Sequence, residues 1–163
     1  MKGFFLRHQP PVRPLAAIIG GAGAATIIAI LALASNVGPV LWVMAPFGAT
    51  CVLLFASPQA PLSQPMNIIC GNTVSAIVGV VCVYIDPGQF WLAGLAVGLS
   101  ITLMMLLRIV HPPAGATALL AYLTGAGWFF ILFPVLAGSI LLVAFATLWH
   151  RFTGGGYPLQ PPI

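Results

Sequence analysis

Long apolar runs alternate with short polar connections along the chain, and these runs are the elements that the sequence predicts. A helix needs about 20 residues to cross the hydrocarbon core of a bilayer. Four runs approach or exceed that length without an internal charge, and they are predicted as spanning helices: residues 15–34, 68–85, 90–107 and 128–149. The last of them contains Pro134, which predicts a mild interruption.

Two further apolar runs are broken by proline. The run at 40–56 is interrupted at Pro46, and the run at 111–123 begins with the stretch HPPAGAT. Proline is favoured at the first helical position, so Pro113 is expected to open a helix, with His111 and the next proline as an extended lead-in. At about 1.5 Å per residue, this helix is too short to cross the membrane alone.

The distribution of charge gives the expected orientation. If residues 1–14 form a cytoplasmic arm and the chain crosses six times, all five Lys and Arg residues lie on one side and Asp86 on the other. The positive-inside rule favours this arrangement, with both termini cytoplasmic. If the two proline-containing segments only dip in and return, Arg108 moves outside and a four-crossing alternative results. Residues 152–163 are expected to form a flexible or extended tail.

Composition decides the broad class of protein. The chain is 61% hydrophobic and 4% charged, whereas soluble domains are about 25% charged. The lipid bilayer is therefore the expected surroundings, and the chain is predicted to be an integral membrane protein. A net charge of +4 would suggest nucleic acid in a soluble protein, but here the basic residues stand at segment ends and no nucleic-acid partner is expected.

An internal repeat is visible in the two proline-broken segments. Residues 45–54 (APFGATCVLL) align with residues 112–121 (PPAGATALLA) at an offset of 112 − 45 = 67, with five of ten positions identical. A chance match between two Ala-, Leu- and Gly-rich stretches is the alternative. A duplication predicts an all-α inverted repeat of three segments each, about 15–85 and 90–150, in a single transmembrane domain at 15–151, with the second and fifth segments broken or half-length.

The repeat suggests an anion site. The N-terminal ends of the two PxGAT helices would converge near the midplane, and helix N-termini attract anions through free N–H groups, here those of Ala114 and its neighbours. Glycine leaves the backbone accessible, and threonine supplies a hydroxyl. The candidate substrate-binding residues are Pro46, Gly48, Ala49, Thr50, Asn72, Arg108, His111, Pro113, Gly115, Ala116 and Thr117.

Several of these candidates have a second interpretation. Thr50 and Thr117 either offer their hydroxyls to an anion or bond back to the carbonyl four residues earlier. His111 is either an anion-contacting or proton-coupling group or a cap at the cytoplasmic interface. Arg108 either belongs to the site or extends to lipid headgroups. Asn72, placed inside an apolar segment, needs hydrogen-bond partners in either case.

The residue inventory argues against an enzyme. The chain has one acidic residue, its three cysteines lie inside apolar segments without forming a ligand-like cluster, and no HExxH or Ser-His-Asp arrangement is present. No cofactor or metal is expected. Small residues spaced four apart on several segments suit close helix packing, which is compatible with a homo-oligomer. A non-transporting membrane partner subunit that packs through these faces is the second hypothesis for the function.

The motifs also carry a resemblance. HPPAGATAL at residues 111–119 resembles the signature of the HPP family of small integral membrane proteins, and residues 46–72 resemble the family's other shared block. The resemblance implies a multi-helix membrane domain and, from plastid and cyanobacterial members, nitrite transport. Without a transit peptide the chain resembles a bacterial member, in the plasma (inner) membrane. The expected function is a transporter or channel for a small monovalent anion, nitrite first.

Overall fold

Six α-helices make up the fold of the described part of the chain. The computed structural model describes residues 6, 7 and 9–159. The helices are α1 (Pro14–Val37), α2 (Ala45–Ala56), α3 (Pro65–Ile85), α4 (Phe90–Leu106), α5 (Pro112–Leu123) and α6 (Ala137–Thr153), with a 3₁₀ turn η1 (Pro61–Ser63) and an irregular segment η2 (Ile131–Leu136). The prediction of an all-α membrane protein is confirmed.

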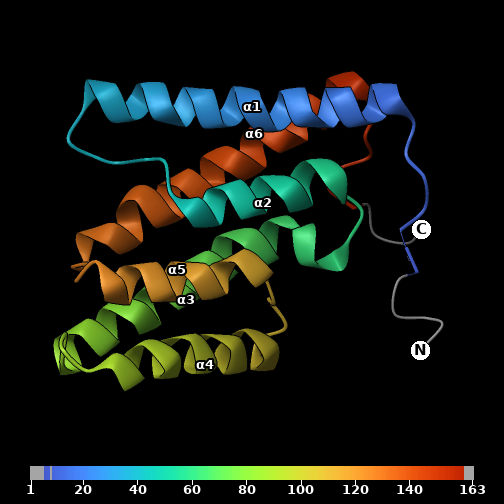
Figure 1. Ribbon diagram of the computed structural model, residues 1–163. Helices are drawn as coiled ribbons and strands as arrows, with labels where there is room; N and C mark the ends of the chain where they lie inside the picture. The colour runs from blue at the N-terminus through green and yellow to red at the C-terminus, as the bar shows by residue number, and fades with distance from the viewer. Residues whose placement is uncertain (1–5, 8, 160–163) are drawn as a thin grey trace.

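Successive helices run in alternating directions (Figure 1). The described part near the N-terminus, the C-terminal end of α6 and the α4–α5 connection lie at one end of the bundle, and the α3–α4 turn lies at the other. This is the arrangement of the six-crossing prediction. Three helical stretches are long and apolar enough to cross a membrane alone: α1, α3 and the stretch from η2 through α6. Helices α2 and α5 have 12 residues each, about 18 Å, as the half-length prediction requires.

Proline determines where several helices begin. Helices α1, α2, α3 and α5 each carry proline in one of their first two positions, where its missing N–H costs nothing. Pro112, one residue earlier than expected, opens α5. The interruption of the last apolar run is stronger than expected. Phe133 has non-helical φ −136° and ψ 120°, because Pro134 disfavours the helical conformation for the residue before it.

The helices pack in two groups, and each group includes one helix from the other half of the sequence. Helices α1, α2 and α6 contact one another, and so do α3, α4 and α5, while α2–α5 and α3–α6 contacts join the groups. If α1, α2 and α3 correspond to α4, α5 and α6, each group contains two helices of one repeat and the third helix of the other. An inverted repeat predicts this pattern.

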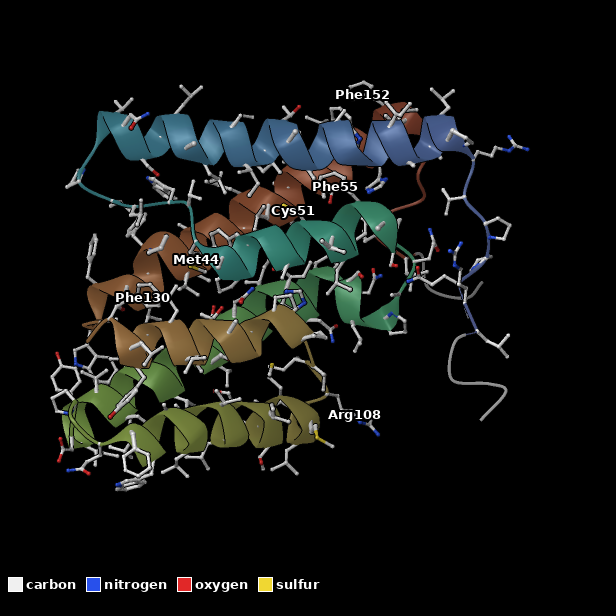
Figure 2. The ribbon with its side chains drawn as sticks, viewed as in Figure 1. Met44, Cys51, Phe55, Arg108, Phe130 and Phe152 are labelled. Atoms are coloured by element: carbon white, nitrogen blue, oxygen red, sulfur yellow. The ribbon has the colours of Figure 1, made fainter. Side chains whose placement is uncertain are left out.

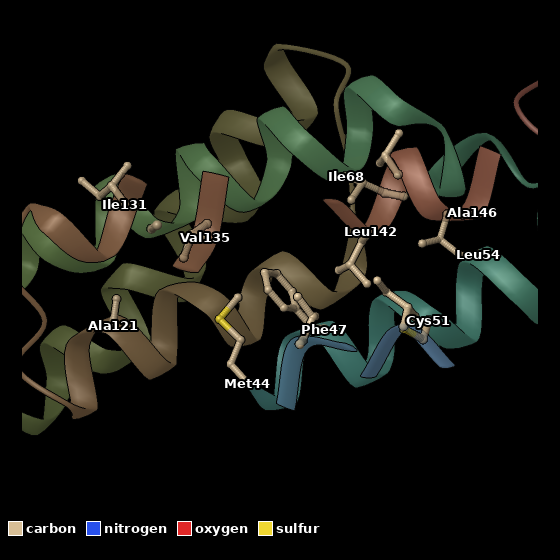
Figure 3. Close-up of a cluster of buried hydrophobic side chains, with 14 of the residues drawn as sticks. Met44, Phe47, Cys51, Leu54, Ile68, Ala121, Ile131, Val135, Leu142 and Ala146 are labelled. Carbon is tan, nitrogen blue, oxygen red and sulfur yellow. The ribbon is translucent and has the colours of Figure 1, made fainter. Parts of the chain in front are cut away.

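The main core lies between the groups. Figure 3 shows Phe47 and Leu54 of α2 close to Leu142 of α6, and Ile68 of α3 belongs to the same buried cluster. Glycine allows the closest helix contact. A Cβ on Gly79 of α3 would lie 2.5 Å from the carbonyl oxygen of Ala118 on α5, so only glycine fits without movement.

The end of the described chain, residues 154–159, packs on the α2–α3 connection. Tyr157 is 5% exposed, the carbonyl of Gly156 accepts a hydrogen bond from Gln59, and the N–H of Leu159 donates to Gln64 at 2.9 Å. The aromatic ring of Tyr157 supplies the apolar contact that the Gly- and Pro-rich composition concealed.

Candidate functional site

A buried polar contact joins the two PxGAT helices, which lie side by side and antiparallel (Figure 1). Thr50, in the second turn of α2, places its hydroxyl 2.9 Å from Nε2 of His111, the residue that precedes α5. Nδ1 of His111 lies 3.0 Å from the carbonyl oxygen of Leu62, and the Thr50 hydroxyl lies 3.0 Å from the carbonyl oxygen of Pro46. Both side chains are 0% exposed.

A second polar pair lies between α5 and α3. The Thr117 hydroxyl donates to Oδ1 of Asn72 at 2.7 Å, and the Asn72 amide donates to the carbonyl of Ile68 at 3.0 Å. Neither Thr117 nor Asn72 is exposed. The residue before Asn72, Gly71, packs on His111, because a Cβ at position 71 would lie 3.0 Å from the His111 Cβ. Helix α3 therefore contacts His111 with one residue and Thr117 with the next.

The connection before α5 fixes the backbone of His111. Helix α4 ends in a Schellman motif, in which the N–H of Ile109 bonds the carbonyl of Met104 at 2.9 Å and the N–H of Arg108 bonds that of Met105 at 3.2 Å. The side-chain amide of Asn67 donates to the carbonyl of Val110 at 2.8 Å. His111 then takes an extended conformation, φ −135° and ψ 105°, which suits a residue before proline.

The supply of free N–H groups is smaller than the sequence suggested. The N–H of Ala114 donates to the carbonyl of His111 at 2.9 Å, and that of Phe47 to the carbonyl of Met44 at 2.9 Å. Proline residues at the starts of both helices remove further donors. The expectation that Ala114 offers a free N–H to an anion is therefore wrong, and side chains are the polar groups that meet in this region.

The structure divides the candidate residues into two sets. The buried set is Pro46, Thr50, Asn72, His111, Pro113 and Thr117, whereas Gly48, Ala49, Arg108, Gly115 and Ala116 are exposed or half-buried. Gly48 lines a cavity of about 600 Å³ among α1, α2 and α6, which Thr50 and His111 do not line. Gly115 faces α4, where the nearest atom to an added Cβ is Val97 Cγ1 at 4.0 Å. Arg108 points away from the bundle (Figure 2).

Among the described residues, no carboxylate lies in this region. Asp86, the one acidic residue of the chain, is in the α3–α4 turn at the opposite end of the bundle, where its side chain accepts a hydrogen bond from the N–H of Gly88 at 2.9 Å. Within the described residues, no group of three His, Cys, Asp or Glu side chains could hold a metal ion. The buried polar cluster, defined as Thr50, His111, Thr117 and Asn72, thus combines hydroxyl, imidazole and amide groups without a negative charge.

The comparison with protein families decides what the chain is related to. The family model described as HPP, transmembrane region, matches residues 9–158. The chain belongs to the HPP family. Two transmembrane proteins of Dictyostelium discoideum are similar to this HPP protein: one is 38% identical over 122 residues, covering 69% of this chain and 43% of the relative. The other is 33% identical over 159 residues, covering 89% of this chain and 51% of the relative.

The chain therefore spans about half the length of the curated relatives that it matches. No solved structure matches this HPP protein. The relatives are named only as transmembrane proteins, which supports an integral membrane protein and gives no substrate.

Sequence reasoning missed three groups that hold His111 in place. The carbonyl of Leu62, the side chain of Asn67 and the missing side chain of Gly71 all lie in the second block of the family resemblance, residues 46–72. Small and polar residues recur just before and within α3, and this was the available signal for a packing site. The sequence spacing does not reveal that these residues contact the α4–α5 connection, because that contact is tertiary.

Proposed function

We propose that this HPP protein transports a small monovalent anion, with nitrite as the first candidate. The observation that supports the proposal is the buried polar cluster. Polar side chains are costly inside an apolar bundle and generally mark a pathway or binding site. Hydroxyl, amide and imidazole groups suit an anion, and the nearest acidic residue in the chain is at the far end of the bundle.

The position of the cluster suggests how an anion would pass. Thr50 belongs to the group α1, α2 and α6, whereas His111 belongs to the group α3, α4 and α5, so their hydrogen bond crosses the boundary between the groups. Both residues are closed off from solvent in this structure. Rocking of one helix group against the other would open the cluster alternately to each side, as in other inverted-repeat transporters.

Charge suggests the orientation in the membrane. Arg108 lies at the same end of the bundle as the two ends of the described chain (Figure 2). Arg13 precedes α1 and Arg151 lies in the last turn of α6, also at this end. By the positive-inside rule this end is proposed to be cytoplasmic, and the resemblance to bacterial members favours the bacterial plasma membrane.

Flux through proteoliposomes tests the proposal. The purified chain is reconstituted and the uptake of nitrite, nitrate and formate is compared with that of protein-free vesicles. Thr117→Val removes the hydroxyl that donates to Asn72 and is expected to reduce anion flux. Thr102→Val is the matched control, because Thr102 is exposed on α4 and bonds only the carbonyl of Gly98 in its own helix. An absence of protein-dependent flux for every anion of the panel contradicts the proposal.

A partner role without transport is the second candidate, and two exposed surfaces favour it. An added Cβ on Gly94 or Gly98 of α4 would meet nothing within 4 Å, so no other described segment packs on this face at either glycine. In the most apolar 18-residue stretch of α1, 17% of the residues are buried, whereas in that of α3 the share is 44%. Mass measurement of the detergent-solubilised chain tests association through these faces; a monomer without anion flux contradicts both candidates.

A further inference from the structure

The hydrogen bonds around His111 restrict where protons can be. The carbonyl oxygen of Leu62 can only accept, so Nδ1 of His111 must carry a hydrogen. The Thr50 hydroxyl has one hydrogen and two neighbours that could receive it, the carbonyl of Pro46 at 3.0 Å and Nε2 of His111 at 2.9 Å. It can serve only one of them at a time.

Two protonation states follow from this geometry. In a neutral His111, Thr50 donates to Nε2 and gives up its bond to Pro46. In a doubly protonated His111, Nε2 donates to the Thr50 oxygen, Thr50 donates to the Pro46 carbonyl, and Nδ1 donates to Leu62. The charged state therefore satisfies every hydrogen-bonding group in this set, and the neutral state leaves the Thr50 contact to Pro46 unmade.

The charged state nevertheless lacks a counter-charge. The elements packed around His111 carry six titratable or charged residues: the thiols Cys51, Cys70 and Cys82, the phenols Tyr84 and Tyr122, and the exposed cation Arg108. None of these thiols, phenols or cations supplies a negative charge, and Asp86 lies in the turn at the opposite end of the bundle. A buried charge without a partner is strongly unfavourable. A bound anion would supply the missing charge, which makes proton binding and anion binding favour each other.

We propose that His111 takes up one proton with each transported anion, so that transport is an electroneutral symport of one proton and one monovalent anion. The proposal rests on the proposed anion transport and specifies its coupling. On one side of the membrane, neutral His111 accepts a proton at Nε2 as the anion binds. On the other side the anion leaves and Nε2 releases the same proton, which restores the neutral ring, so charge and protons balance over the cycle.

The test measures proton and anion movement together in proteoliposomes of the full chain. Nitrate is the main probe, because it stays ionised across the working pH range and carries no proton through the bilayer by itself. Nitrite is measured in parallel with protein-free vesicles subtracted. A trapped pH dye reports protons that enter with the anion, and a potassium gradient with valinomycin sets the voltage.

Coupling predicts a distinct set of results. Protons and anions enter in a one-to-one ratio, a pH difference of one unit drives about tenfold accumulation of anion, and voltage at equal pH drives none. Accumulation driven by voltage, without proton entry, overturns the symport and leaves anion transport intact. Absence of any protein-dependent flux overturns both proposals.

Variants assign the coupling to His111. His111→Gln is expected to lose anion-driven proton entry. His150→Gln is the matched control, because His150 is the other described histidine with a buried ring and bonds the carbonyl of Leu54 on α2, outside the cluster. Unchanged one-to-one coupling in His111→Gln contradicts the assignment, and the wild-type ratio decides the symport even if that variant fails to fold.

Discussion

Arg108 occupies a backbone conformation that favours glycine, and its replacement by glycine is expected to stabilise the fold. Its φ of 59° makes it the one described non-glycine residue with positive φ. The Schellman motif at the end of α5 has the same two hydrogen bonds and places Gly125 there, with φ 62°. The same structural position is therefore filled by glycine at one helix end and by arginine at the other.

The expected magnitude follows from two opposing terms. A left-handed conformation costs an L-residue about 1 to 2 kcal/mol, which Arg108→Gly removes. Glycine loses more chain entropy on folding, which costs about 0.5 to 1 kcal/mol. The net gain in the free energy of unfolding is about 0.5 to 1 kcal/mol, or about 1 to 4 °C in melting temperature for a chain of this size.

Thermal unfolding in detergent measures the effect, with Gly125→Ala as the mirror-image control. That variant is expected to lose about the same 0.5 to 1 kcal/mol for the same reason.

Although Arg108→Gly is expected to be more stable, it is expected to take up less anion, because it removes the cation next to the His111 connection. Arg108→Lys keeps the charge and is expected to retain uptake. A loss of stability in Arg108→Gly would refute the strain argument, and undiminished uptake would refute a role for the charge.

Three further predictions concern packing around the cluster. Gly71→Ala places a methyl group 3.0 Å from the His111 Cβ and is expected to reduce anion uptake in a folded protein, whereas Gly94→Ala, with nothing within 4 Å, should leave uptake unchanged; equal uptake in the two variants contradicts the role of Gly71. Asn72→Leu leaves the Thr117 hydroxyl without its acceptor and should lower the free energy of unfolding by about 1 to 3 kcal/mol, measured by chemical denaturation; no loss would mean that the pair is not formed. Gly79→Ala should lower the melting temperature, because its Cβ would lie 2.5 Å from the α5 backbone, and an unchanged melting curve contradicts that close contact.

Hydropathy and proline spacing were sufficient to predict the helices but not their interruptions in detail. The apolar runs are long and the prolines stand at helix starts, so the number and order of the described helices were correct. The break at Phe133 was underestimated, because local rules show that proline disturbs a helix but not whether surrounding helices tolerate a complete interruption.

The sequence singled out the residues of the buried polar cluster but not how they are arranged. The repeat identified Thr50 and Thr117 as equivalent, and both are buried in polar pairs. Their partners differ, since Thr50 meets a histidine and Thr117 an asparagine. Gly48 and Gly115 were expected beside them, but a helix turns 100° per residue and places these glycines on other faces. Which face meets which neighbour is decided by packing between distant segments.

The proposed symport carries one proton rather than two, and the comparison of the two aligned segments is consistent with that number. At the offset of 67, His111 corresponds to Met44 (111 − 67 = 44), and both residues directly precede their PxGAT helix. Met44 is buried in the apolar core and cannot take a proton at this position. The two halves of the bundle therefore share a helical arrangement but not a titratable group. The variant His111→Met makes the two halves alike at this position. It is expected to fold, because methionine adapts to buried sites, and to lose proton entry entirely, because the buried polar cluster then contains no histidine.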